Sequence, residues 1–308
     1  MGAAMKFLIC LLFLLISFNA NAATCFWVGG TSDFDNANAA SWSSGTGGAG
    51  STCAATGGIP KNAGDVATFD GASGGGTITV CGAAAANCPS ASGSLSIAQI
   101  TCGAFTGTLD FAAIDPNVTL TTAFNCSGTG TRTVNLGDGI WTLSAAGAVV
   151  WDLTTVTNLT FNANSSTIDL ATTATSNRTF VGGGRTYNIF TITNSASSQW
   201  KVRITGSNTF ASWAFTNLRW FELAAGVTQT ISGAITYNGT SSAQSSLVTD
   251  GSTSTISVGS AVVLSWLFIQ SITKAGAGSI IATNSFDGGN NSGVTITAPT
   301  GGARIIGG

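Results

Sequence analysis

The residue types that most often carry out catalysis are sparse in this chain. It has no histidine, ten lysines and arginines, and twelve aspartates and glutamates in 308 residues. Carboxylates are thus the main acid/base candidates, and a glycoside hydrolase needs two of them roughly 5 to 10 Å apart. Asp33 and Asp35 would share one face of a strand, and Arg203 or Arg219 could supply the base of a β-helix lyase. Most acids adjoin glycine or asparagine, which is typical of turns, so we predict that the protein is not an enzyme.

Metal and cofactor sites are not indicated. The weak candidate for calcium is Asp287 in the segment Asp287-Gly288-Gly289-Asn290-Asn291, whose oxygens are ligands that calcium accepts. This segment lacks the regular acid spacing of a calcium-binding repeat, and it favours a turn with left-handed backbone conformations. Wide cysteine spacing and the absence of histidine argue against zinc. We therefore expect no cofactor.

Aromatic residues offer a speculative binding site. Among eight tryptophans, Trp200, Trp213 and Trp220 lie close together in the sequence, and Tyr187 is near them. An exposed row of such rings could hold a glycan by stacking on the apolar faces of its sugars. The alternative, which we favour, is that these rings fill the core or cap its end.

Cysteines cluster in the first half of the chain. Cys10 lies in the N-terminal apolar segment, and six others follow. An even number in an exported protein suggests disulfides, with 15 possible connectivities for six cysteines. Loop length alone favours the pairs Cys25–Cys53, Cys81–Cys88 and Cys102–Cys126.

The N-terminus has the layout of a secretory signal peptide. Lys6 precedes an apolar run over residues 7–18, and Ala20 and Ala22 form an A-x-A site, so we predict cleavage after Ala22. Twelve apolar residues are too few for a bilayer, which takes roughly 20, although an uncleaved anchor is the alternative. The apolar residues 261–269 are few enough for a buried strand. We therefore predict no membrane-spanning segment in the mature chain. We expect an exported protein, extracellular or at the cell surface.

Composition limits the partners. Charged residues make up 7% of the chain, against roughly 25% in typical soluble domains. The sequence contains no basic patch, which argues against nucleic acid as a partner. The remaining candidates are a surface glycan or another copy of the chain.

Short alternating segments predict an all-β fold. Each has a period of two and lies between Gly, Asn, Ser or Asp clusters; they cover residues 77–80, 107–111, 117–121, 158–162, 188–193, 201–204, 229–232 and 293–297. Recurring Thr and Asn, the absence of a linker and few paired charges favour a parallel β-helix or β-solenoid with a period of roughly 20 residues over a β-sandwich. The predicted divisions are the signal peptide (1–22), a loop-rich, disulfide-containing N-terminal cap with first coils (23–90), the solenoid (91–297) and a Gly-rich tail (298–308).

Two stretches resemble a known module. The first opens with Phe26-Trp27-Val28-Gly29-Gly30 and continues to Asp65-Val66-Ala67-Thr68-Phe69-Asp70. The second runs from Phe180-Val181-Gly182-Gly183-Gly184-Arg185-Thr186-Tyr187-Asn188 through Ile204-Thr205-Gly206-Ser207-Asn208-Thr209-Phe210 to Asp287-Gly288-Gly289-Asn290-Asn291-Ser292-Gly293. Together they are similar to Gly/Thr-rich β-solenoid modules of bacterial surface or secreted proteins and of phage tail-fibre or virion proteins. Phe34 and Val294 stand where that module usually has tryptophan.

The resemblance implies a structural or adhesive module without assigned catalysis. The leading interpretation is a non-catalytic, exported surface or extracellular protein that binds a glycan or has a structural role. A phage tail fibre or other virion protein, a carbohydrate-active β-helix enzyme, and an ice-binding protein are the alternatives.

Overall fold

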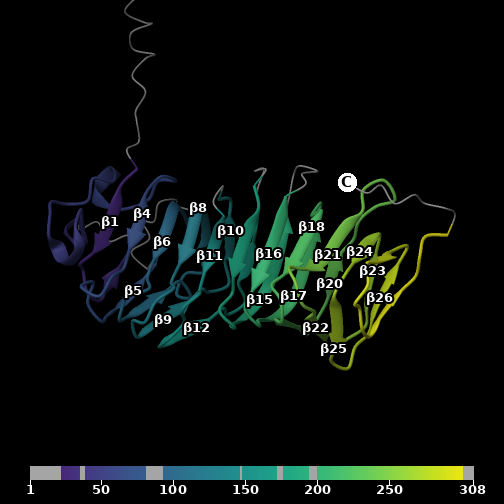
Figure 1. Ribbon diagram of the computed structural model, residues 1–308. Coiled ribbons are helices and arrows are strands. Elements are labelled where there is room, and N and C mark those ends of the chain that lie inside the picture. Colours follow the sequence, from purple (N-terminus) through teal and green to yellow (C-terminus); the bar gives the residue numbers. More distant parts are fainter. Residues whose placement is uncertain are drawn as a thin grey trace, which may run out of the picture.

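The computed structural model describes residues 22–34, 39–80, 93–145, 148–171, 176–193 and 200–300. These residues form 28 strands and three short 3₁₀ helices, η1 (Ala39–Ser41), η2 (Thr46–Gly48) and η3 (Thr56–Gly58). The strands stack into an elongated column that runs from the N-terminal coils, in purple, to the C-terminal coils, in yellow (Figure 1). Over these described ranges, no helix combines the length and apolar character needed to cross a membrane.

Strands from successive coils pair in parallel. Ser94 pairs with Asn117 of the next coil, 23 positions later, whereas Phe268 pairs with Phe286 after 18 positions. Parallel pairing of each coil with the next one defines a parallel β-helix and not a sandwich, as predicted. All eight predicted alternating segments contain strands.

The register divides the strands among three faces, which we call A, B and C. Face A contains β1 (Thr24–Trp27), β4 (Val66–Thr68), the second halves of β6 (Ser94–Thr101) and β8 (Asn117–Asn125), β11 (Val149–Asp152), β14 (Arg178–Val181), β16 (Lys201–Thr205), β18 (Trp220–Leu223), β21 (Ser245–Thr249), β24 (Leu267–Ile269) and β27 (Phe286–Asp287). Face B contains the first halves of β6 and β8, β10 (Ile140–Leu143), β13 (Thr167–Asp169), the second halves of β15 (Thr186–Thr193) and β17 (Thr209–Thr216), β20 (Ile235–Tyr237), β23 (Val262–Ser265), β26 (Ile280–Thr283) and β28 (Val294–Ile296).

Face C is interrupted. Its first part contains β2 (Ser32–Asp33), β5 (Thr77–Thr79), β7 (Thr108–Asp110), β9 (Arg132–Asn135) and β12 (Leu159–Asn162). Its second part contains the first halves of β15 and β17, β19 (Thr228–Ile231), β22 (Ser254–Val258) and β25 (Ile272–Ala275). The strands β6, β8, β15 and β17 each bend at a corner and so contribute to two faces. β12 and β15 belong to different sheets, so a seam separates the two parts.

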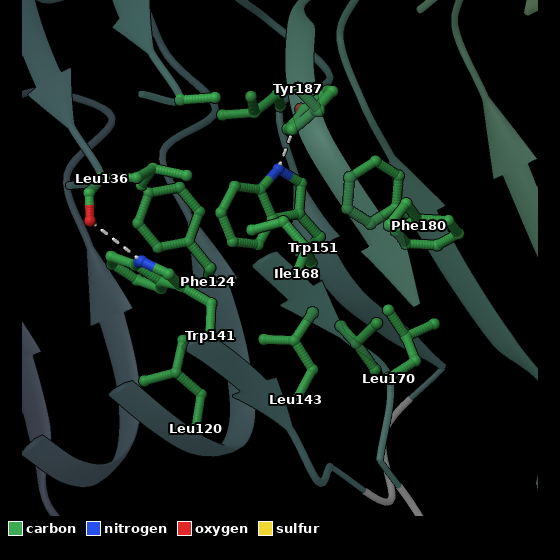
Figure 2. Close-up of a cluster of buried hydrophobic side chains, with 14 of the residues drawn as sticks. Leu120, Phe124, Leu136, Trp141, Leu143, Trp151, Ile168, Leu170, Phe180 and Tyr187 are labelled. Atoms are coloured by element: carbon green, nitrogen blue, oxygen red, sulfur yellow. Dashed lines mark hydrogen bonds between the residues drawn. The ribbon is translucent and has the colours of Figure 1, made fainter. Parts of the chain in front are cut away.

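Columns of inward side chains build one continuous core. On face A, Phe124, Trp151 and Phe180 are in register in successive coils, and all three are fully buried. The Trp151 ring stacks on Phe124 with a centroid separation of 4.2 Å and on Phe180 at 5.7 Å. Figure 2 shows these rings in a row beside the aliphatic side chains of Leu120, Leu143 and Leu170. The Trp151 indole N–H donates to the Tyr187 hydroxyl at 3.1 Å. Burial of so much apolar area, at about 25 cal/mol per Å², supplies the main driving force for folding.

Outward positions carry hydroxyls stacked from coil to coil. Thr77, Thr108, Thr133 and Thr160 occupy one column of face C, each in register with the next. The recurrence of Thr in the sequence predicted such stacking. A column of β-branched hydroxyl side chains suits a half-exposed sheet surface.

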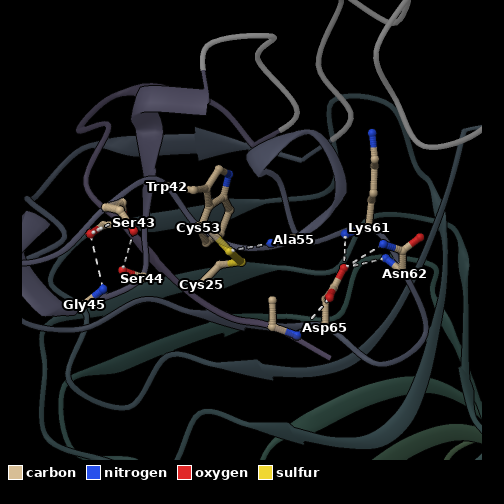
Figure 3. Close-up of a disulfide and its surroundings, with 12 residues drawn as sticks. Cys25, Trp42, Ser43, Ser44, Gly45, Cys53, Ala55, Lys61, Asn62 and Asp65 are labelled. Carbon is tan, nitrogen blue, oxygen red and sulfur yellow. Dashed lines mark hydrogen bonds between the residues drawn. A yellow bond between two sulfur atoms is a disulfide. The ribbon is translucent and has the colours of Figure 1, made fainter. Parts of the chain in front are cut away.

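The N-terminal coils are closed by irregular structure and by disulfides. β1 pairs antiparallel with β3 (Trp42–Ser43). Disulfides join Cys25 to Cys53 (Figure 3) and Cys102 to Cys126, as predicted. The predicted pair Cys81–Cys88 lies outside the described residues, as does the signal peptide up to residue 21. An antiparallel flap over the first coil protects its open strand edges from pairing with other chains.

Candidate functional site

The predicted stacking residues divide between the core and the surface. Trp200, Trp213 and Tyr187 each expose only 2% of their surface, whereas Trp220 exposes 45%. Because side chains alternate across a strand, Trp213 and Tyr187 point into the coil interior, where Trp213 contacts Phe210 and Tyr187 contacts Phe180. Of the four candidate stacking residues, Trp200, Trp213 and Tyr187 therefore pack in the core, which is the alternative favoured from the sequence, and only Trp220 is exposed.

Trp220 lies on face A beside a network of charges. Its register partners are Lys201 on β16 and Ser246 on β21. Glu222, two positions further along the same outward side of β18, accepts hydrogen bonds from the Lys201 Nζ at 2.8 and 3.0 Å. We call Lys201, Arg203, Trp220, Glu222 and Asp250 the Trp220 patch.

Ion pairs hold the charges of this patch in place. Arg203 lies between two carboxylates: its Nε is 3.5 Å from the Glu222 Oε1, and its Nη2 pairs with Asp250. Asp250 also accepts the backbone N–H of Ala225. Arg203, one of the two candidate lyase bases, is therefore engaged by two carboxylates. The other, Arg219, donates from its Nη1 to the Gln244 carbonyl at 3.2 Å.

Several carboxylates serve turns; the neighbouring glycines predicted this for Asp70 and Asp287, whereas Asp110 and Asp152 lie between apolar residues. Asp70, Asp110, Asp152 and Asp287 each accept the backbone N–H of the residue two positions later, at 2.8 to 3.0 Å. This is the Asx-turn, in which a side chain replaces a backbone acceptor. Asp33 is half-buried on β2, and Asp35 lies outside the described residues.

The calcium candidate is a turn of the same kind. The Asp287 Oδ1 accepts from the Gly289 N–H at 2.8 Å and from the Asn291 Nδ2 at 2.6 Å. Gly289 and Asn290 have positive φ of 93° and 58°, the left-handed conformations that the sequence predicted. Within the described ranges, no three Cys, Asp or Glu side chains are grouped so that they could hold a metal ion.

A groove of about 570 Å³ opens where face C is interrupted. β12 pairs with β9 and, among the described strands, with no later one. The seam lets part of the Phe161 ring reach the surface, 5.2 Å from the Tyr187 ring and at an angle of 57° to it. We call this space the seam groove; its lining residues are Phe161, Asn162, Ala163, Asn164, Thr186, Tyr187, Asn188, Thr209, Phe210, Ala211 and Ser232.

The lining of the seam groove is polar but uncharged. It combines three asparagine amides, three hydroxyls of Thr186, Thr209 and Ser232, and aromatic rings, and none of its residues is ionisable except Tyr187. Burial raises the pKa of Tyr187 far above the ordinary value for a phenol, so this side chain stays neutral. Its hydroxyl donates to the Gly182 carbonyl at 2.8 Å, and its ring lies buried beneath the groove. Such a lining suits a neutral, hydroxyl-rich ligand.

Sequence reasoning did not find the seam groove. Its asparagines and threonines are indistinguishable in sequence from those of ordinary turns and outward strand positions. Only the missing pairing between β12 and β15 brings Phe161 to the surface. Tyr187, a speculative candidate for stacking on a glycan, is buried beneath the groove.

No protein-family model, no curated protein and no solved structure matches this chain.

Proposed function

We propose that this chain is a non-catalytic, exported surface or extracellular protein with a structural or adhesive role, and that it binds a neutral glycan in the seam groove. The observation that carries the proposal is the groove lining, in which amides, hydroxyls and the half-buried Phe161 ring face one space without a charged side chain. Ligand sites of roughly 300–1,000 Å³ with a few polar groups over an apolar floor are typical of small-molecule recognition.

The architecture supports the adhesive role. A parallel β-helix displays one long surface on a rigid core, and repeat folds of this kind are used for extended binding surfaces. The described acids that form turns, such as Asp110 and Asp152, use an oxygen to hold the backbone. They are therefore poorly placed to exchange protons with a substrate, which supports a binding role over a catalytic one.

The test is binding of soluble neutral hexasaccharides, namely cello-, xylo-, laminari-, chito-, manno- and maltohexaose, measured by saturation-transfer NMR and calorimetry. Ala211 is half-exposed and lines the groove, so Ala211→Trp fills the groove without changing the core. The matched control is Thr119→Trp, which adds an indole at a half-exposed position of face B.

We expect at least one hexasaccharide to bind the unaltered protein, and Ala211→Trp to weaken it at least tenfold while Thr119→Trp does not. Trp220→Ala tests the Trp220 patch in the same assay. If binding is lost in Trp220→Ala but not in Ala211→Trp, the groove is not the site. If none of the six sugars binds at millimolar concentration, the glycan proposal fails.

A further inference from the structure

The carboxylate of Asp65 is buried close to the start of the first strand. Asp65 exposes 1% of its surface. Its Oδ2 accepts three hydrogen bonds, from the backbone N–H groups of Lys61 and Asn62 at 3.1 and 3.0 Å and from the Asn62 Nδ2 at 3.1 Å (Figure 3). Its Oδ1 accepts the backbone N–H of Ala23 at 3.1 Å.

The position of Ala23 is fixed on both sides. Its carbonyl accepts the Val66 N–H at 2.8 Å, and Thr24, the next residue, pairs with Val66 in the parallel register of β1 and β4. Asp65 is fixed as well, because its own carbonyl accepts the Ala98 N–H of the following coil at 2.7 Å. The Ala23 nitrogen is thus held against the Asp65 carboxylate by the fold and by neighbouring coils.

The buried carboxylate has no cationic side chain paired with it among the described residues. The three ion pairs found there all lie among Lys201, Arg203, Glu222 and Asp250, on distant coils. Burying a charge without an opposite charge is costly. Neutral donors, such as the Asn62 amide, offset only part of that cost.

We propose that cleavage between Ala22 and Ala23 supplies the missing charge, because the new α-ammonium group of Ala23 forms a buried ion pair with Asp65. A signal peptidase would hydrolyse the Ala22–Ala23 bond with water, which leaves a carboxylate on Ala22 and an amine on Ala23. An α-amino group has an ordinary pKa of about 7.7–8.0, so the amine takes up a proton at neutral pH. This inference rests on the proposed export but not on glycan binding.

The ion pair would make removal of the signal a step in completing the N-terminal cap. Cys25, two positions after Ala23, is bonded to Cys53, and the α-ammonium would fix the start of the same strand, β1. The first coil would therefore reach full stability only after processing.

The experiment compares chains that differ only at the N-terminus. The protein is produced in an oxidising host as a fusion whose protease leaves no extra residue, so that one form begins at Ala23 and a second begins at Ala22. Each is also made with Asp65→Asn, which keeps the size and one of the two acceptor oxygens but removes the charge. Hydrogen exchange of peptides from residues 58–69 measures the cap, and peptides from residues 209–216 provide an internal control.

We expect amide hydrogens in residues 58–69 to exchange at least tenfold faster in the form beginning at Ala22 than in the form beginning at Ala23. Exchange in residues 209–216 should be the same in both forms. In the Asp65→Asn background, the extra residue should make no difference. Equal protection of the two forms with Asp65 intact would overturn the inference, even if export and processing are correct.

The intact mass of the naturally produced protein distinguishes failure of the proposed export from failure of the proposed ion pair. A chain beginning at Ala23 is the expected result. A chain beginning at Met1 would remove the proposed export itself, and a chain beginning at any other residue would overturn the pairing of Asp65 with the new terminus.

Discussion

Arg132 shows how single residues hold the corners of the coils. Only 1% of its surface is exposed, and its guanidinium donates to four backbone carbonyls, those of Cys126, Gly130, Thr155 and Thr157. Burial, and to a lesser extent the charge of Arg185, lowers the pKa of Arg132. The guanidinium therefore ties two neighbouring coils together at one corner.

Replacing Arg132 tests this role. We expect Arg132→Met to lower the free energy of unfolding by at least about 2 kcal/mol, because several buried carbonyls lose their donors. Arg219→Met is the matched control, since the Arg219 side chain is half-exposed and donates to the Gln244 carbonyl; its cost should be under about 1 kcal/mol. Urea denaturation followed by tryptophan fluorescence gives both values, and equal losses would contradict the account.

The two tyrosines predict a pH dependence. Burial raises the pKa of Tyr187 and of Tyr237 above the ordinary phenol value of about 10. For groups whose pKa is raised by folding, the stabilisation is complete below the unfolded pKa and is lost as pH rises toward the folded one. These are the only tyrosines in the chain. Phenolate absorbance should thus be absent from native protein at pH 10.5 and appear only with unfolding; a gradual titration near pH 10 would disprove the burial.

Residue roles could be predicted from sequence only where chemistry is local. The turn roles of Asp70 and Asp287 followed from the glycines that come after them. The burial of Trp213 and the exposure of Trp220 did not, because both lie in strands and the side facing the core depends on the register. The hydrogen bond between the Ala23 N–H and Asp65 was also invisible, since pairing of β1 with β4 brings these two residues together.

At the scale of elements, strands could be predicted from their period of two and their turn residues. The segment 201–204, for example, became β16 (Lys201–Thr205). The apolar segment 261–269 became β23 and β24, separated by Trp266 with a φ of 57°. What could not be predicted was which strands lack a partner, because the seam between β12 and β15 depends on how two whole coils bend.

The disulfide between Cys102 and Cys126 links neighbouring coils, so removing it tests whether the stability of the column is local. Cys102 and Cys126 are 24 positions apart and lie in successive coils. A closed loop of that size stabilises the fold by about 3 kcal/mol in the loop-entropy account. Replacing both with alanine should increase hydrogen exchange in residues 94–125 while leaving residues 245–275 unchanged, because each coil contacts mainly its neighbours. Equal loss of protection in both ranges would contradict this local stability.

The whole molecule is a column with one continuous core and three outer faces. Face A alone contains eleven strands, which at about 4.8 Å per strand gives a length of about 50 Å. Two features along this column could bind a ligand, the Trp220 patch on face A and the seam groove on face C. Both features lie in the middle and C-terminal coils, away from the N-terminal cap.

The claim that this column binds glycans without cleaving them is tested most directly by incubating the mature protein with insoluble cellulose, chitin, xylan and β-1,3-glucan. Sedimentation measures retention, and a reducing-end assay measures cleavage in the same samples. We predict retention on at least one polymer with no increase in reducing ends. Accumulation of reducing ends, or protein left entirely in the supernatant of all four polymers, would contradict the account.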